Sequence, residues 1–289
     1  MAKFNFKYKK KKIPLAIINA RITKKTFRKW MLIPKTAKLI FSSFDLCLTS
    51  NIETKKFLSR LNAKNIFYEG NIKLINYTFS DYKNSFKSEG LGKNKFWLAA
   101  STHSGEELFC LETHIKLRKK LNDFVTIIAP RHINRVSEIK KLCNKKKINS
   151  KIINHDKEVS NGCEVYIINY FGALSKYYKF AKSVFIGKSL IKKLKDDSGQ
   201  NPIDAAKSGC KIYHGPYVYN FEEIYQILEE NGVSKIINSV DDLVDYLYLD
   251  LNNSNVRNNK ISSKLNNLGE QTLFATMKNI NKFLLNEFN

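Results

Sequence analysis

Short apolar runs alternate with amphipathic stretches along most of this chain of 289 residues. Runs of apolar and β-branched residues predict buried strands, and apolar residues three or four apart predict helices. Strands that alternate with helices form parallel sheets flanked by helices, so the pattern predicts the α/β class. The predicted strands are Pro14–Asn19, Asp45–Thr49, Asn65–Tyr68, Phe96–Ser101, Phe124–Ala129, Val165–Asn169 and Ser183–Gly187, with weaker candidates at Lys211–Tyr213 and Lys235–Ile237.

Two polar stretches divide this alternation. We expect a partial N-terminal domain at residues 1–77, a linker at 78–94, a C-terminal domain at 95–251, and a polar stretch with a final helix at 252–289. Three strand candidates are too few for an independent doubly wound domain, so the chain is expected to begin inside a domain. The predicted helices are Thr26–Phe41, Ile52–Leu61, Gly105–Leu121, Val136–Lys147, Phe171–Ala181, Pro202–Ser208, Phe221–Glu230, Val240–Leu251 and Glu270–Phe288.

The charge balance leaves three explanations open. The net charge is +24, from 50 Lys and Arg against 26 Asp and Glu. Such a charge favours nucleic-acid binding, or binding to an anionic membrane or a phosphorylated substrate, or it reflects a coding bias toward Lys, Asn and Ile. Basic residues are interspersed with the aromatic and apolar residues Phe4, Phe6, Tyr8, Phe27, Trp30, Met31 and Leu32, a pattern typical of a surface that faces anionic lipid. A solvated helix face is the alternative there.

The remaining composition argues against several classes of protein. The five cysteines form no CxxC pair and the five histidines are scattered, so we expect reduced thiols and no metal site. No apolar run reaches the roughly 18 residues that a membrane span needs. We therefore expect a cytoplasmic protein.

The loops that follow strands hold the candidate chemistry, because ligands of open parallel sheets bind at the carboxyl ends of the strands. Ser101, Thr102, Ser104 and Gly105 lie between a strong strand and a helix. Hydroxyls and free backbone N–H groups at a helix start suit an anion, so they form a possible anion site. The alternative is a capping box in which Ser104 caps the helix and Glu107 reaches back.

Two further loops supply polar and planar contacts. Pro130-Arg131 ends a strand, and the Arg131 guanidinium can donate paired hydrogen bonds to a phosphate. Phe171-Gly172-Ala173 opens a helix at a glycine, where a planar ring can approach the backbone. An exposed arginine and an ordinary turn glycine are the alternatives.

A fourth loop contains a strong helix start. Asn201 suits the N-cap, Pro202 the first helical position, and Asp204 the third. The same helix end attracts phosphate. An acid there can also accept hydrogen bonds from ribose hydroxyls.

These loops carry a family resemblance. Residues 97–107, Trp-Leu-Ala-Ala-Ser-Thr-His-Ser-Gly-Glu-Glu, resemble the W-[IL]-A-x-S-T-H-x-G-E-E segment of 3-deoxy-D-manno-octulosonic acid (Kdo) transferases. The similarity runs from about residue 13 to about residue 250. Further matches in family order are Asn19-Ala20-Arg21, Gly70-Asn71-Ile72-Lys73, Pro130-Arg131-His132 with Arg135, Gly172-x-Leu174, Phe185-Ile186-Gly187-Lys188-Ser189-Leu190, Asn201-Pro202, and Gly215-Pro216-Tyr217 with Asn220-Phe221.

The resemblance implies a GT-B glycosyltransferase with a complete C-terminal Rossmann-like domain and a partial N-terminal one. It implies transfer of Kdo from CMP-Kdo to a lipid A precursor (lipid IVA) in lipopolysaccharide biosynthesis. The transfer would invert the anomeric centre at the inner membrane without a metal or cofactor. The family's general base lies in a region that this sequence does not include. We therefore expect the chain alone to bind CMP-Kdo weakly and to turn over poorly, because such a base is worth about 10²–10⁴-fold.

The resemblance also implies roles for individual residues. Lys73 would neutralise the charge that develops on the departing CMP. Two positions depart from the family pattern: Ala173 stands in place of an acidic residue, and Asp204 in place of a longer Glu. The CMP-Kdo contacts would be Pro130 and Arg131 on the CMP moiety, Phe171, Gly172 and Ala173 on the cytosine side, and Asn201, Pro202, Ile203 and Asp204 on the ribose and phosphate.

Three other functions stay open. The fold is compatible with another GT-B transferase or a nucleotide-sugar epimerase. The charge alone is compatible with a nucleic-acid-binding protein, although no RRM, KH or zinc signature supports one and we expect no nucleic-acid partner. A catalytically inactive remnant is the third.

Overall fold

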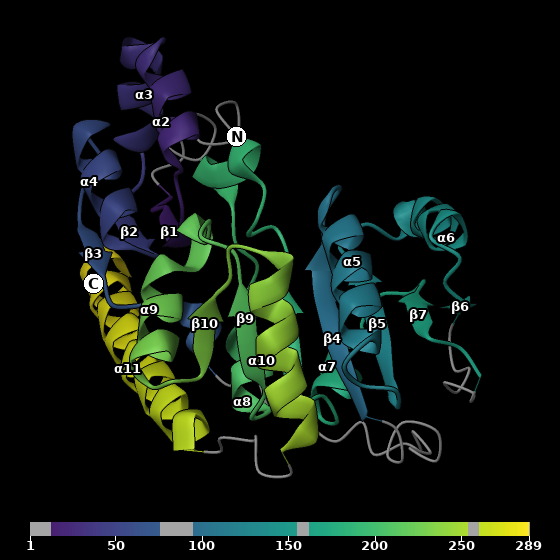
Figure 1. Cartoon of the computed structure of the whole chain (residues 1–289). Coiled ribbons are helices and arrows are strands. Elements are labelled where there is room, and N and C mark those ends of the chain that lie inside the picture. The colour runs from purple at the N-terminus through teal and green to yellow at the C-terminus, as the bar shows by residue number, and fades with distance from the viewer. Residues whose placement is uncertain (1–12, 76–94, 155–161, 254–259, 289) are drawn as a thin grey trace. The chain divides into compact units, whose positions relative to one another are not determined.

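The computed structural model describes residues 13–75, 95–154, 162–253 and 260–288. The chain divides into two compact units, Met1–Thr78 with Lys264–Asn289, and Phe79–Ser263. Each contains its own parallel sheet (Figure 1). The predicted linker lies outside the described residues.

The first unit contains a three-stranded parallel sheet in the order β1-β2-β3. The helices between the strands bury Phe27, Ala37 and Leu58 against the strand residue Cys47. The elements are β1 (Ala16–Ala20), α2 (Lys24–Met31), α3 (Pro34–Phe41), β2 (Leu46–Thr49), α4 (Ile52–Arg60), β3 (Ile66–Tyr68) and the 3₁₀ turn η1 (Ile72–Leu74).

The helix predicted at 26–41 is in fact two helices, α2 and α3. Pro34 is the first residue of α3, where its missing N–H and fixed φ are tolerated. A proline inside one continuous helix would remove a backbone hydrogen bond. The first helix therefore ends at Met31, and a second one begins at Pro34.

The C-terminal helix α11 (Lys260–Phe288) starts ten residues earlier than predicted. Most of it belongs to the first unit, whereas the sequence analysis set it apart. The contacts with the segment after β3 are close: Asn279 Nδ2 donates to Glu69 Oε1 at 3.0 Å. A Cβ placed on Gly269 would lie 2.5 Å from the Leu74 carbonyl oxygen, so only glycine fits there.

The second unit is built on a seven-stranded, all-parallel sheet in the order β10-β9-β8-β4-β5-β7-β6. Its core joins Trp97 of β4 to Leu111 and Leu117 of α5 and to Leu243 and Leu247 of α10. The elements are β4 (Lys95–Thr102), α5 (Glu106–Arg118), β5 (Phe124–Pro130), η2 (Ile133–Arg135), α6 (Val136–Lys145), β6 (Ser150–Ile153), β7 (Val165–Ile168), α7 (Leu174–Tyr178), β8 (Ser183–Ile186), η3 (Lys192–Asp197), α8 (Ile203–Lys207), β9 (Lys211–His214), η4 (Tyr219–Phe221), α9 (Glu222–Glu230), β10 (Ser234–Ile236) and α10 (Val240–Asn252).

The sequence analysis missed strand β6. The strand has only four residues, and one of them, Lys151, is exposed. It lies at the edge of the sheet and pairs with β7 alone. An edge strand needs no continuous apolar run, so the signal was weak.

The strand order places a topological switch point between β4 and β8. The chain leaves β4 toward β5 on one side, and leaves β8 toward β9 on the other. The carboxyl ends of two such strands flank a crevice, which is where open α/β sheets bind ligands. Ser101 has a φ of 55°, at a register shift that kinks the end of β4.

Candidate functional site

A cavity of about 270 Å³ lies at the carboxyl edge of the second sheet. Its walls come from the ends of β4, β5 and β7, from the loop that leads into α7, and from α8. This volume is near the lower end of the roughly 300–1,000 Å³ typical of ligand pockets. The lining residues are Ser101, Ala129, Pro130, Arg131, Ile133, Ile168, Tyr170, Phe171, Gly172, Ala173, Leu174, Ser175 and Asp204.

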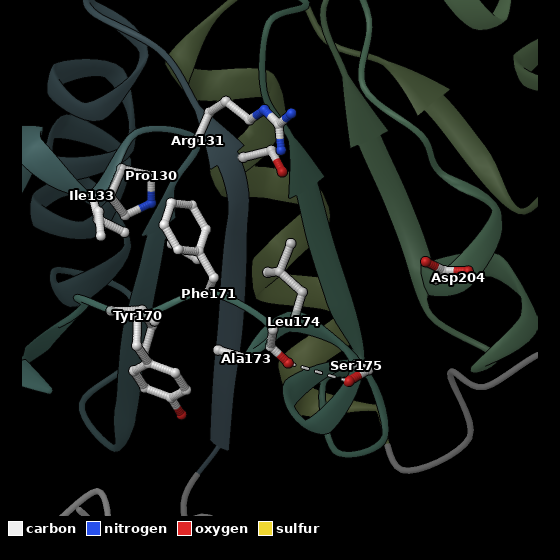
Figure 2. Close-up of a pocket in the computed structure, with 13 residues that line it drawn as sticks. Pro130, Arg131, Ile133, Tyr170, Phe171, Ala173, Leu174, Ser175 and Asp204 are labelled. Atoms are coloured by element: carbon white, nitrogen blue, oxygen red, sulfur yellow. Dashed lines mark hydrogen bonds between the residues drawn. The ribbon is translucent and has the colours of Figure 1, made fainter. Parts of the chain in front are cut away.

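Three side chains give this cavity its chemical character. Arg131 follows β5 and is exposed, and its backbone N–H donates to the Thr102 carbonyl at 3.0 Å, which fixes the loop. The Phe171 ring is 70% exposed. Figure 2 shows the Phe171 ring beside Pro130, with Asp204 on the opposite side of the cavity. The site thus offers a cation, an aromatic face and a carboxylate.

The turn from β7 into α7 depends on Gly172. This residue has a φ of 81°, a backbone conformation that residues with a Cβ rarely adopt. Nothing lies within 4 Å of the position that a Cβ would occupy, so conformation and not space explains the glycine. Ala173 is buried at the start of α7, and Ser175 Oγ donates to the Gly172 carbonyl at 3.4 Å (Figure 2).

Of the segment 201–204, only Asp204 lines the cavity. Pro202 and Ile203 are buried, and Asn201 Oδ1 accepts a hydrogen bond from the Ile203 N–H at 3.0 Å. The side chain of Asn201 therefore holds the start of α8. Helix α8 has five residues and begins at Ile203, one residue later than predicted.

The predicted capping box at α5 is wrong. The N-cap is Gly105, with a φ of 98°, and it makes no side-chain hydrogen bond. The exposed Ser104 does not cap the helix, and Glu107 pairs with Arg135 instead of reaching back. The acid that reaches back is Glu106, whose Oε2 accepts from the His103 N–H at 2.9 Å.

Glu106 also takes one of the backbone donors of the possible anion site in this loop. The His103 N–H that would face an anion is used by Glu106. Thr102 is fully buried, and only Ser101 lines the cavity. Thr102, Ser104 and Gly105 therefore lie outside it.

Glu107 and Arg135 form a second buried interaction behind this loop. Their side chains are 1% and 15% exposed, and Arg135 Nη1 donates to Glu107 Oε1. Burial raises the pKa of Glu107, and the hydrogen bond from Arg135 acts in the opposite direction. The pair joins α5 to the turn that follows Arg131.

Two histidines, His103 and His132, lie near Arg131. The rings of His103 and His132 are 5.7 Å apart, edge to face. Burial, together with the nearby charges of Lys188 and Arg131, lowers the pKa of His103 to about 4, although a hydrogen bond with the Ser101 carbonyl acts in the opposite direction. His103 is therefore neutral at physiological pH.

Lys73 lies in the first unit, in the turn η1 after β3, and it is exposed. Its backbone N–H donates to Asn71 Oδ1 at 3.1 Å. The contacts between α11 and Leu74 fix the same turn. Its position is thus set by contacts within the first unit.

The contacts expected from the sequence did not include several wall residues, among them Ile133, Ile168 and Tyr170. Each lies at or just after the carboxyl end of β5 or β7, and that position was the available signal. The described residues contain no group of three or more metal-ligating side chains. Across those same stretches of chain, every helix is too short or too polar to cross a bilayer.

Comparison with known proteins identifies relatives along most of the chain. Residues 3–76 match the family described as 3-deoxy-D-manno-octulosonic-acid transferase (kdotransferase). A protein of Arabidopsis thaliana named "Probable 3-deoxy-D-manno-octulosonic acid transferase, mitochondrial" is 29% identical over 75% of this chain and 50% of its own length. The 3-deoxy-D-manno-octulosonic acid transferase of Haemophilus influenzae is 25% identical over 94% of this chain and 63% of its own. The chain thus spans about half to two thirds of these relatives' length.

Solved structures show the same fold. The C-terminal CMP-Kdo binding domain of WaaA from Acinetobacter baumannii has a TM-score of 0.53 and 21% identity, and the match covers 64% of this chain and 93% of that domain. UDP-N-acetylglucosamine 2-epimerase from Rickettsia bellii has a TM-score of 0.53 and 14% identity, over 98% of this chain and 72% of that one. The predicted GT-B fold and the predicted family resemblance are both confirmed.

Proposed function

Because the chain is related to the Kdo transferases in sequence and fold, we propose that it takes part in transferring Kdo from CMP-Kdo to a lipid A precursor. The second unit would bind the CMP of the donor, and the first unit would meet the acceptor. The transfer would invert the anomeric centre and use neither a metal ion nor a cofactor. The protein would work at the cytoplasmic face of the inner membrane.

The convergence of Arg131, Phe171 and Asp204 on one cavity is the observation that supports this proposal best. A nucleoside monophosphate offers an anionic phosphate, a planar base and ribose hydroxyls. Arg131 can donate paired hydrogen bonds to the phosphate. Phe171 can stack on the base, and Asp204 can accept hydrogen bonds from the ribose.

Leaving-group stabilisation is the chemical task of these groups. The acceptor hydroxyl oxygen bonds to the anomeric carbon of Kdo, and the bond from that carbon to the phosphate oxygen breaks. The electron pair of the broken bond goes to CMP, whose negative charge therefore increases. A positioned cation lowers the barrier because it binds the transition state more tightly than the donor. Arg131 would act at the phosphate, and Lys73 is proposed to approach it from the first unit.

The acceptor proton must leave during the same reaction. We propose that the general base lies in the part of the relatives that this chain does not match. Binding of CMP is then the activity to test first on the chain itself, and turnover is expected to be poor.

The turn between α2 and α3 supports contact with a membrane. Leu32 is 82% exposed and Ile33 50% exposed. Arg28, Lys29 and Lys35 lie beside them in sequence. An apolar tip with basic neighbours inserts into an anionic lipid surface, where burial of the tip and electrostatic attraction add.

Titration calorimetry with CMP and UDP tests the donor proposal. The wild-type chain should bind CMP more tightly than UDP, and Arg131→Ala should weaken CMP binding about 10- to 100-fold, because a hydrogen bond between charged groups contributes about 1.5–3 kcal/mol. Lys151→Ala, an exposed cation on β6, removes the same charge away from the cavity and is the control. Preference for UDP would favour a nucleotide-sugar epimerase. RNA binding that weakens steeply with salt, without any effect of CMP, would favour a nucleic-acid-binding protein.

A further inference from the structure

Glu106 occupies the topological switch point of the second sheet. It is the first residue of α5 and is only 1% exposed. The strands on either side, β4 and β8, are joined beyond their last paired residues by a hydrogen bond from the Gly187 N–H to the Ala100 carbonyl at 2.8 Å. The carboxylate thus lies where the loops after these two strands meet.

Four backbone N–H groups donate to this one carboxylate. Oε2 accepts from His103 at 2.9 Å and from Lys188 at 2.7 Å. Oε1 accepts from Ser189 at 2.9 Å and from Leu190 at 3.1 Å. Three of the donors are consecutive in the loop after β8, and the fourth comes from the loop after β4.

A cradle of backbone N–H groups at a switch point is the arrangement that binds phosphate in many α/β proteins. Here a side chain of the protein fills it. The space is closed as well, since a Cβ on Gly187 would lie 2.5 Å from the Ser101 carbonyl and 2.8 Å from Glu106 Oε2. An external anion therefore has no room at this point, and the cavity lies instead along β5 and β7.

Both loops held by Glu106 lead to walls of that cavity. On one side, Ser101 lines the cavity two residues before His103. On the other, the Lys188 carbonyl accepts from the Gly199 N–H at 2.7 Å, at the start of the segment that leads to Asp204. Ser189 extends the network to the loop after β9, because its Oγ accepts from the Gly215 N–H at 2.9 Å.

We propose that Glu106 is a positioning residue for the nucleotide site: an internal anion that takes the place of a ligand phosphate. It fixes the loop that follows Ser101 and the loop that leads toward Asp204. This inference rests on the proposed CMP site. It goes beyond it by assigning a role to a buried side chain that does not line the cavity.

The chemistry of this cradle makes Glu106→Gln an informative substitution. A carboxylate presents acceptors on both oxygens, whereas an amide presents one acceptor and one NH₂ group. In either orientation the NH₂ would face two backbone N–H donors, so two of the four hydrogen bonds are lost. Glu106→Asp retains both acceptors but is one methylene shorter.

Asp250 supplies a matched control. Its Oδ2 accepts from Ser183 Oγ at 2.7 Å and from Tyr213 Oη at 2.5 Å. Ser183 begins β8, so this carboxylate acts at the amino end of the same strand. In Asp250→Asn the remaining oxygen can accept both hydrogen bonds, but the charge that strengthens them is removed. The substitution should therefore destabilise the fold without touching the loops that follow the strands.

The test combines CMP titration calorimetry with amide hydrogen exchange on each purified full chain, well below its melting temperature. In Glu106→Gln, the amides of Lys188, Ser189 and Leu190 should exchange faster and the Kd for CMP should rise about 10- to 100-fold, the loss expected from a displaced binding wall. Glu106→Asp should show a smaller rise. Asp250→Asn should lower the melting temperature while its Kd for CMP and the exchange of those amides stay at wild-type values.

The outcomes separate this inference from the proposed function. An unchanged Kd in a folded Glu106→Gln chain would overturn the positioning role, even where wild type binds CMP. Equal losses of CMP affinity in the Glu106 and Asp250 variants would also overturn it, because general destabilisation would then explain both. If wild type fails to bind CMP, the proposed function fails, and the exchange of the three amides still reports whether Glu106 holds the loop. Should Glu106→Gln not fold, Glu106→Asp decides by the same two measurements.

Discussion

Replacing Arg135 with methionine removes the partner of a buried carboxylate and keeps most of the aliphatic length of the side chain. Glu107 is 1% exposed, and Arg135 donates to it from a position that is 15% exposed. Breaking a buried ion pair by removing one partner costs about 3–5 kcal/mol, because the remaining charge is left in a poorly solvated site. The Arg135–Glu138 contact adds little, since Glu138 is 56% exposed.

The cost should depend on pH. Burial raises the pKa of Glu107, and Arg135 opposes this, so the substitution raises that pKa further. A carboxyl group whose pKa is raised by folding destabilises the native state as the pH rises above its value in the unfolded chain. Relative to wild type, the variant should therefore lose about 3–5 kcal/mol at pH 8 and clearly less at pH 5, where Glu107 can take up a proton.

Urea unfolding followed by circular dichroism measures this, with each variant compared with wild type at the same pH. Arg118→Met is the control, because it makes the same change to a net charge of +24. Its partner Glu164 lies 3.3 Å away and is 30% exposed, so the loss should stay below about 1 kcal/mol. A loss for Arg135→Met that is below about 1 kcal/mol at pH 8, or equal at both pH values, would refute the reasoning.

Two further predictions concern acid stability and membrane contact. Burial lowers the pKa of His114 from 6.5 to about 4, so its stabilising effect is complete above pH 6.5 and is lost as the pH falls. Between pH 7 and pH 5, the free energy of unfolding of wild type should therefore fall by about 2 kcal/mol more than that of His114→Gln. Equal decreases for the two proteins, measured by urea unfolding, would contradict this. Leu32→Ser should weaken binding to vesicles containing anionic lipid about 10- to 100-fold in co-sedimentation, since a buried leucine contributes about 1.5–3 kcal/mol. Leu249→Ser, 63% exposed on α10, is the control, and an equal loss there would argue against a specific tip.

Most strands and the parallel class could be predicted because buried strands leave a strong local signal. The core strand β5, for instance, is buried along its whole length and is apolar apart from Thr126. Helix boundaries that depend on one residue, such as the end of the helix before Pro34, were harder to predict, because apolar periodicity continues across the turn. The edge strand β6 was missed because it has a neighbouring strand on one side only, and such a strand needs no continuous apolar run.

The candidate site was predictable only in part. Arg131, Phe171 and Gly172 could be singled out because position at the end of a strand is encoded in the local pattern. The sequence could not predict that Asp204 lines the cavity whereas Asn201 holds the start of the helix. Two residues that are three apart at one helix start face different surroundings. The role of Lys73 stays a prediction, because its turn belongs to the first unit and the cavity to the second.

The alternation of strands and helices, the family resemblance and the residues at the strand ends can be predicted from the chain, because they depend on neighbours along it. The role of Glu106 cannot, because it depends on contacts between distant segments. Its local pattern resembles a helix cap, but its hydrogen-bond partners Lys188, Ser189 and Leu190 lie 82 to 84 residues away. They meet Glu106 because β8 pairs with β4, and this pairing is a property of the whole sheet.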